Sequence, residues 1–310
     1  MAQAAARKWV RLMGNPENKH LERVRDWILL RINSRARAKP MSKWQAGCPD
    51  LVPGLRANAL WPTNEPGFEW VAELERNYDV IKEELLELRN SKGFQPYRQP
   101  TWSTKLAAKD QVGGVSHDSG DWNVFYLFLH DRRFEENCSR CPRTVELLER
   151  LAPRQYKHAF FSALNPGTHV IPHTGPTNKK LRCHLPLVGI EGSRLRVADQ
   201  VVEQEAGRCY VFDDSMEHEA WHDGPETRIV LLFDIWHPDF SDEEVKFLSY
   251  LQLSQMRAER EASEGDDRLD NFYTLIDRTR DMLSDNAWWI TANGGDSNAS
   301  SADQPTAACE

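Results

Sequence analysis

Histidines are concentrated in one part of the chain. Five of the ten lie between positions 169 and 222, namely His169, His173, His184, His218 and His222. A cluster of imidazoles suggests a metal site, because imidazole is the commonest metal ligand among protein side chains. Two patterns within this stretch compete for the metal, and they predict different enzymes.

The first pattern is the pentapeptide HEAWH at 218–222, which has the HExxH spacing of zinc proteases. That spacing works on a helix, which places both imidazoles on one face beside a glutamate that acts as general base. Here the segment lies between two strand-like runs, RCYVFDD (208–214) and TRIVLLFDIW (227–236), and Gly224-Pro225 follows it closely. We therefore keep an HExxH zinc metalloprotease only as a minor alternative.

The second pattern is distributed over His173, Arg182, His218 and Arg228. Two imidazoles brought from different strands of a β-sandwich can hold Fe(II) and leave several coordination positions open. An arginine one strand away can bind a carboxylate through two hydrogen bonds, which a lysine does less specifically. This layout is typical of Fe(II)/2-oxoglutarate oxygenases, although the spacing alone is only suggestive.

The elements that must position these residues change character along the chain. Leu21, Val24, Ile28 and Ile32 recur at helical spacing, and a second helix is predicted from Val71 to Leu88. From about residue 120 the pattern becomes strand-like. Candidate strands cover 121–130, 157–164, 182–190, 193–199, 208–214 and 227–236, with Gly- and Pro-containing turns between most of them. Many short strands predict an antiparallel sandwich or barrel.

The C-terminal part returns to helical patterns. Ser241 and Glu244 form a capping box before a closing helix, a second helix is predicted around 267–284, and the tail from Asn293 is predicted to be disordered. We therefore divide the chain into an N-terminal helical extension (1–44), a catalytic domain (45–240), C-terminal helices (241–290) and a tail (291–310).

Composition limits the classes of partner and compartment. Lys and Arg number 39 against 47 Asp and Glu, a net charge of −8, which argues against a nucleic-acid partner. No stretch approaches the roughly 20 apolar residues of a membrane span, and the start lacks a signal peptide. As written, we expect a cytoplasmic chain, with an upstream membrane anchor left open. Six cysteines indicate reduced thiols, and Cys138 and Cys141 leave a local disulfide or metal site open.

Longer stretches carry a specific resemblance. FSALNPGTHVIPHTGPTNKKLRCHLPL (161–187) and GRCYVFDDSMEHEAWHDGPETRIVLLFDIWHP (207–238) resemble the catalytic domain of the aspartyl/asparaginyl β-hydroxylase family. The resemblance continues through GDWNVFYLF (120–128) and NCSRCPRTVELLERL (137–151). It extends more loosely to LVPGLRA (51–57) and LERN (74–77), so that it covers roughly 45–240. It implies a mainly β protein with flanking helices around a double-stranded β-helix, a jelly-roll, cupin-like core.

The resemblance also implies roles for individual residues. His173 and His218 would be the two iron ligands. Other oxygenases carry a carboxylate ligand at the position of Gly175, whereas the family that this chain resembles lacks it, as this chain does. The residues implied to bind 2-oxoglutarate are Trp122, Ser162, Arg182, His184 and Arg228, and Arg228 is our choice for the distal carboxylate. The implied cofactor is Fe(II), the cosubstrates are 2-oxoglutarate and O2, and the implied partner is a polypeptide hydroxylated at the β-carbon of an Asp or Asn residue.

Alternatives stay open at several positions. His169, His222 and His237 are interpreted as structural, because a single histidine on a strand is more often a satisfied polar residue than a ligand. Asp213 and Asp214 either orient the second ligand or cap a turn. A related jelly-roll oxygenase acting on an acyl or another acid-bearing substrate is the main functional alternative. A non-catalytic sensor would be expected to lose a ligand or Arg228, and neither is lost.

Overall fold

Two antiparallel sheets face each other in the computed structural model, which describes residues 16–32, 38–151, 154–283 and 287–291. The larger sheet has the order β1-β13-β10-β15-β8-β6-β2, with β7 against β6. Its strands are β1 (Leu60–Trp61), β2 (Gln95–Pro96), β6 (Trp122–Leu129), β7 (Arg132–Arg133), β8 (Gln155–Leu164), β10 (Lys180–Val188), β13 (Tyr210–Phe212) and β15 (Arg228–Trp236). All of its pairings are antiparallel.

The smaller sheet has the order β12-β11-β14-β9-β5. Its strands are β5 (His117–Ser119), β9 (Thr168–His173), β11 (Ser193–Val197), β12 (Gln200–Glu203) and β14 (His218–His222), and a separate hairpin pairs β3 (Leu106–Ala107) with β4 (Gly114–Val115). Two facing antiparallel sheets confirm the predicted jelly-roll core with flanking helices. The predicted strands lie close to the observed ones, although the run 208–214 contributes only β13.

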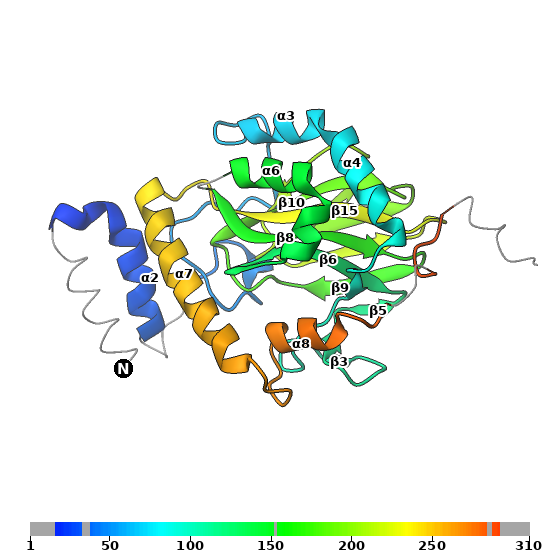
Figure 1. Ribbon diagram of the computed structural model, residues 1–310. Helices are drawn as coiled ribbons and strands as arrows, with labels where there is room; N and C mark the ends of the chain where they lie inside the picture. The colour runs from blue at the N-terminus through cyan, green and yellow to red at the C-terminus, as the bar shows by residue number, and fades with distance from the viewer. Residues whose placement is uncertain (1–15, 33–37, 152–153, 284–286, 292–310) are drawn as a thin grey trace, which may run out of the picture.

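Helices cover the outer face of the larger sheet (Figure 1). These are α3 (Glu69–Arg76), α4 (Tyr78–Glu87), η3 (Leu88–Asn90), α5 (Glu135–Arg140) and α6 (Pro142–Arg150). Alternation along β6 explains why: Phe125 and Leu127 pack against the helices, whereas Val124 and Tyr126 lie in the cluster on the opposite face. Because both faces are covered, every residue of β6 is buried.

The single helix predicted over 71–88 is two helices, which is a correction. Asn77 adopts φ −97° and ψ 14°, and its backbone N–H and its side-chain amide both donate to the carbonyl of Glu73. This local competition between side chain and backbone ends α3 and lets α4 start in a new direction.

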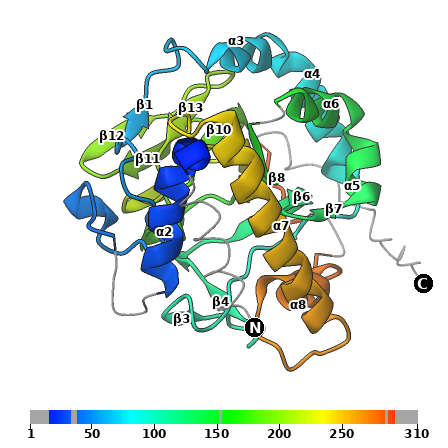
Figure 2. The ribbon, with the colours of Figure 1, turned by 90° about the vertical axis from the view of Figure 1, so that its left-hand side faces the viewer.

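The N-terminal and C-terminal helices lie side by side (Figures 1 and 2). The N-terminal pair is η1 (Pro16–Leu21) and α2 (Glu22–Ile32), η2 (Lys43–Gln45) follows, and the C-terminal helices are α7 (Asp242–Ser263) and α8 (Phe272–Thr279). Val24 of α2 and Leu248 of α7 share one buried cluster with Trp236 of β15. The predicted capping box of Ser241 and Glu244 is present at the start of α7.

Three further expectations concern termini, membranes and thiols. The tail predicted to be disordered lies outside the described residues. Across the described ranges, no helix combines the length and the apolar character that crossing a membrane requires. Cys138 and Cys141 are buried free thiols, and the Cys138 thiol donates to the carbonyl of Leu127 at 3.3 Å. They pack as small apolar side chains beneath α5 and α6.

Candidate active site

His173 and His218 face each other across neighbouring strands. The antiparallel register of β9 and β14 pairs these two residues directly, and their ring centroids lie 4.2 Å apart. Both line a cavity between the two sheets. The register therefore brings together two side chains that are 45 positions apart in the sequence, as the distributed pattern predicted.

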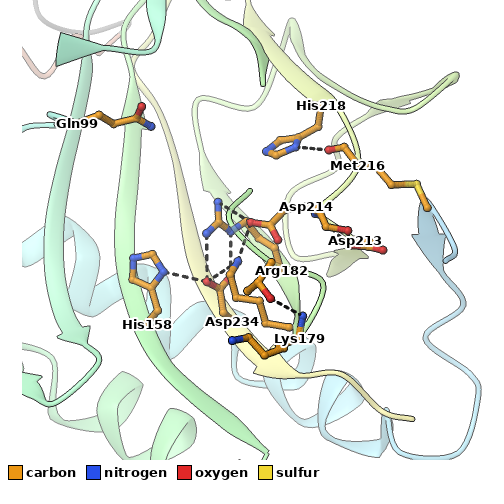
Figure 3. Close-up of polar contacts among 12 residues, drawn as sticks. Gln99, His158, Lys179, Arg182, Asp213, Asp214, Met216, His218 and Asp234 are labelled. Carbon is orange, nitrogen blue, oxygen red and sulfur yellow. Dashed lines mark hydrogen bonds and ion pairs between the residues drawn. The ribbon is translucent and has the colours of Figure 1, made fainter. Parts of the chain in front are cut away.

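Backbone carbonyls fix the orientation of both rings. Nδ1 of His173 bonds the carbonyl of Ile171 at 2.8 Å. Nδ1 of His218 bonds the carbonyl of Met216, also at 2.8 Å (Figure 3). Because a carbonyl only accepts, Nδ1 carries the proton, and Nε2 keeps the lone pair that a metal ion requires. Burial lowers the pKa of both imidazoles, which keeps them neutral. Met216, and not Asp213 or Asp214, orients His218, which corrects one of the two interpretations given for these aspartates.

Asp213 and Asp214 have other partners. Asp213 accepts bonds from the backbone and hydroxyl of Ser215, so it closes a turn, and burial raises the pKa of its carboxyl to about 7. Asp214 fills the space beside Gly175, where a Cβ atom would lie 2.6 Å from Oδ2 of Asp214. Position 175 therefore has no room for a carboxylate ligand. This fits a site in which the two imidazoles are the only protein ligands.

Arg228 lies in the wall of the same cavity and is 2% exposed. Its Nε donates to the hydroxyl of Ser193 at 3.2 Å and its Nη2 to Oε1 of Gln204 at 2.6 Å. Both partners are neutral, and burial lowers the pKa of Arg228 to about 9. A buried guanidinium without a carboxylate among the described residues is unstable unless a ligand supplies the anion.

Three more predicted residues lie beside Arg228 in the cavity wall. The indole Nε1 of Trp122 donates to the hydroxyl of Ser162 at 3.0 Å, and Tyr97 stacks on Trp122 at 4.0 Å between ring centroids. Nε2 of His184 is buried and has no hydrogen-bond partner within the described part of the chain. Trp122, Ser162 and His184 thus lie with Arg228 in one cavity, and the 2-oxoglutarate contact that the resemblance implies for them stays a prediction.

Arg182 also lines the cavity, but its charge is already neutralised. Its Nε and Nη2 bond the two carboxylate oxygens of Asp234 at 2.9 and 3.1 Å, and its Nη1 lies 3.4 Å from Asp214 (Figure 3). Burial alone would lower the pKa of Arg182, but these two carboxylates raise it. Arg182 therefore differs from Arg228, and its predicted contact with 2-oxoglutarate stays a prediction.

Asp234 is the centre of a buried ion network. Besides Arg182, it contacts Lys180 Nζ at 3.0 Å and His158 Nδ1 at 2.9 Å, and it is fully buried. Burial alone would raise the pKa of Asp234, but Arg182 and Lys180 outweigh burial and hold the pKa well below its usual range. The network anchors β10 to β15 directly beneath the cavity.

Asp234→Asn should therefore lower the free energy of unfolding by about 3 kcal/mol at neutral pH, because two buried cations, Lys180 and Arg182, lose one of the two carboxylates that compensate them and keep only Asp214. The difference in unfolding free energy between parent and variant should shrink as the pH falls. The reason is that a carboxylate whose pKa is lowered by folding loses its contribution to stability when it becomes protonated at low pH. Urea denaturation measures both effects. Asp277→Asn removes an exposed pair with Arg132 and should change stability by less than about 1 kcal/mol. Equal effects of the two variants would contradict the structural importance of the network.

The HExxH pentapeptide is strand β14 (His218–His222), not a helix. His222 bonds the carbonyl of Glu226 through Nε2, away from His218. Four residues of extended chain separate the two histidines by about 13 Å, so they cannot share one ion. The geometry therefore excludes the zinc-protease alternative.

His222→Ala should consequently keep metal binding, with 2-oxoglutarate turnover within about tenfold of the parent, a barrier change of about 1.4 kcal/mol or less. Metal content by plasma emission spectroscopy and succinate yield measure this on one variant. Loss of the metal from His222→Ala would overturn the assignment of the site to His173 and His218.

The other two histidines interpreted as structural also have hydrogen-bond partners and do not line the cavity. His169 bonds Asp118 and Glu219 and stacks on Trp221, and His237 bonds the carbonyl of Arg56.

One residue that sequence reasoning missed is Gln204, which bonds both Arg228 and Nδ1 of His184. Its only signal in the sequence is a polar residue after a short strand.

A cavity between two antiparallel sheets, lined by a pair of imidazoles and by an arginine that has no carboxylate partner among the described residues, is the architecture of a double-stranded β-helix protein. Residues 75–238, more than half of the chain, match the family described as Aspartyl/Asparaginyl beta-hydroxylase. The chain belongs to this family, as its motifs predicted.

Individual relatives differ in substrate and length. The chain is 36% identical over 214 residues to the mouse protein named aspartyl/asparaginyl beta-hydroxylase, which covers 67% of this chain but 27% of the mouse protein. It is 33% identical over 174 residues to the ornithine lipid ester-linked acyl 2-hydroxylase of Rhizobium tropici, with 55% and 58% coverage. A solved 2OG-Fe(II) oxygenase from Burkholderia pseudomallei aligns with a TM-score of 0.37 at 11% identity, over 60% of this chain and 96% of that one. The chain thus spans about a quarter of the length of the mouse relative.

Proposed function

We propose that this protein is an Fe(II)- and 2-oxoglutarate-dependent dioxygenase that hydroxylates the β-carbon of an Asp or Asn residue in a polypeptide. The observation that carries the proposal is the cavity itself. Its wall contains the neutral imidazoles of His173 and His218, each with a free lone pair on Nε2. The same wall contains the buried guanidinium of Arg228, which has no carboxylate partner among the described residues. Family membership supports the same reaction class.

The residues present suit this cofactor. Nε2 of His173 and of His218 would hold Fe(II), and with 2-oxoglutarate bound the metal supplies oxygen activation. Arg228 would bind the distal carboxylate of 2-oxoglutarate through charge-assisted hydrogen bonds. The Trp122–Ser162 pair and the Nε2 donor of His184 would fix its orientation in the same pocket.

Apolar side chains form most of the remaining cavity wall. They are Leu164, Val170, Leu195, Phe212, Ala220 and Leu232, and the other lining residue is Glu219, which is paired with Arg196. A mostly apolar wall strengthens the ionic contact with Arg228 and limits competing reactions with water. The protein's own contribution to the reaction is therefore to bind, orient and exclude.

The substrate is tested with a panel of synthetic peptides that carry one Asp or Asn each, incubated with Fe(II), 2-oxoglutarate and O2. The expected result is a gain of one oxygen atom on the Asp or Asn residue, with one succinate formed per hydroxylation. Matched Glu and Gln peptides serve as controls. Succinate formation that no peptide stimulates would contradict a polypeptide substrate.

An acyl substrate is the second candidate, and the Rhizobium tropici relative favours it, because the match covers 58% of that protein. The same assay with an ester-linked acyl lipid in detergent micelles separates the two. Oxygen incorporation into the acyl chain and not into any peptide would replace the polypeptide by a lipid while keeping the reaction class.

A further inference from the structure

Gln204 connects two side chains of the proposed cosubstrate pocket without lining the cavity itself. Its Oε1 accepts from Nη2 of Arg228 at 2.6 Å and from the hydroxyl of Ser193 at 3.1 Å. Its Nε2 lies 3.3 Å from Nδ1 of His184. Gln204 follows β12, and its backbone N–H is bonded to the carbonyl of Ser193, so the loop holds it in place.

The chemistry of the partners allows only one orientation of this amide. A guanidinium only donates, so the carbonyl oxygen of Gln204 must face Arg228. The NH2 group must then face His184 and donate to its Nδ1. A neutral imidazole that accepts at Nδ1 carries its proton on Nε2, and this is the buried His184 nitrogen for which no other described residue supplies a hydrogen-bond partner. Gln204 thereby turns the free nitrogen of His184 into a donor.

The neutrality of Gln204 matters as much as its orientation. The Gln204 amide accepts a hydrogen bond from Nη2 of Arg228 without cancelling the charge of the guanidinium. A carboxylate at the same place would instead form a buried ion pair. Arg182 illustrates that other outcome, because Asp234 neutralises it. Arg228 and His184 therefore remain as a cation and a donor, both available to one anionic ligand.

We propose that Gln204 is a positioning residue that keeps Arg228 uncompensated and His184 protonated on Nε2, so that the pair selects a dicarboxylic cosubstrate. This inference rests on the proposed function, since it names how the pocket is prepared for 2-oxoglutarate. It adds a residue that touches neither metal nor cosubstrate and acts through two residues that do.

Gln204→Glu is the decisive variant, because it keeps the shape and supplies the missing carboxylate. Binding of 2-oxoglutarate, measured by calorimetry with Mn(II) in place of iron, should weaken by at least about 30-fold as Arg228 becomes internally paired. The melting temperature of the ligand-free protein should rise, because a buried cation gains its anion. A purely structural role would move both quantities in the unfavourable direction.

Gln252→Glu is the matched control. Gln252 is a buried glutamine on α7, in a different part of the fold, and it lines neither the cavity nor its polar support. This control should lower the melting temperature and leave 2-oxoglutarate binding unchanged. A Gln204→Glu protein that behaves like Gln252→Glu, or that binds 2-oxoglutarate within about threefold of the parent, would overturn the proposal.

The tautomer of His184 gives an independent measurement. Long-range proton–nitrogen NMR spectra of histidine-labelled protein should show His184 protonated on Nε2 in the parent, and Gln204→Leu should shift it toward the other tautomer. An unchanged tautomer in a folded Gln204→Leu protein would contradict the proposal. If the parent protein binds no 2-oxoglutarate, the proposed function fails, whereas the NMR and melting measurements still decide the role of Gln204.

Discussion

His218→Ala should remove Fe(II) binding and reduce iron-dependent succinate formation below detection. With only two protein ligands, the loss of one imidazole leaves a single donor, so the affinity for the metal should fall by more than the roughly 10- to 100-fold that supporting residues contribute. His173→Ala should have the same effect. Metal content after gel filtration and succinate yield measure it.

A matched control for these variants is His169→Ala. His169 lies in the same strand as His173 but does not line the cavity, and it bonds Asp118 and Glu219. It should retain the metal, and circular dichroism should show that all three variants keep the β core. Full turnover in either His173→Ala or His218→Ala would contradict the assignment of the site.

Arg228→Ala should weaken 2-oxoglutarate binding by about 30- to 1,000-fold, because removing a charge-assisted contact strands a carboxylate at a cost of about 2–4 kcal/mol. Arg228→Lys should recover only part of this, since an ammonium lacks the two parallel donors. The apparent affinity for 2-oxoglutarate, from succinate formation and from calorimetry, measures both variants.

Arg228→Ala also leads to a second prediction, which concerns the stability of the ligand-free protein. Because Arg228 has no carboxylate partner, its loss removes a buried charge that nothing in the described protein compensates. Ligand-free Arg228→Ala should therefore be as stable as the parent or more stable, in contrast to Asp234→Asn. Arg194→Ala, at an exposed pair with Asp223, is the control for loss of a positive charge and should leave 2-oxoglutarate binding unchanged. An unchanged affinity in Arg228→Ala would remove this residue from the pocket.

The sequence predicted β6, β8, β10, β11 and β15 because their signals are local, but it did not predict β9 and β14, the strands that carry His173 and His218. Runs such as the one that became β6 alternate between two covered faces, and Gly and Pro mark the turns between strands. The pairing of His173 with His218 came from motif order and resemblance, since the register between distant strands is not visible in either segment alone. The observed register places His218 beside His173 on the neighbouring strand, whereas His222, the second histidine of the HExxH pattern, lies further along the same strand.

The contacts that support the site residues were beyond sequence reasoning. The carbonyl of Met216 orients His218, and Gln204 supports Arg228, yet a carbonyl exists at every position and an isolated glutamine carries no pattern. The break at Asn77 was missed because the apolar spacing continues through it. Domain boundaries and the cytoplasmic location stay predictions.

The most direct measurement is an anaerobic titration of the Fe(II)-loaded protein with 2-oxoglutarate, followed through the visible absorption of the metal–cosubstrate complex. The account predicts saturation at one 2-oxoglutarate per chain, loss of the signal in His218→Ala and a strongly weakened titration in Arg228→Ala. A protein that binds Fe(II) but shows no saturable response to 2-oxoglutarate would contradict the central claim.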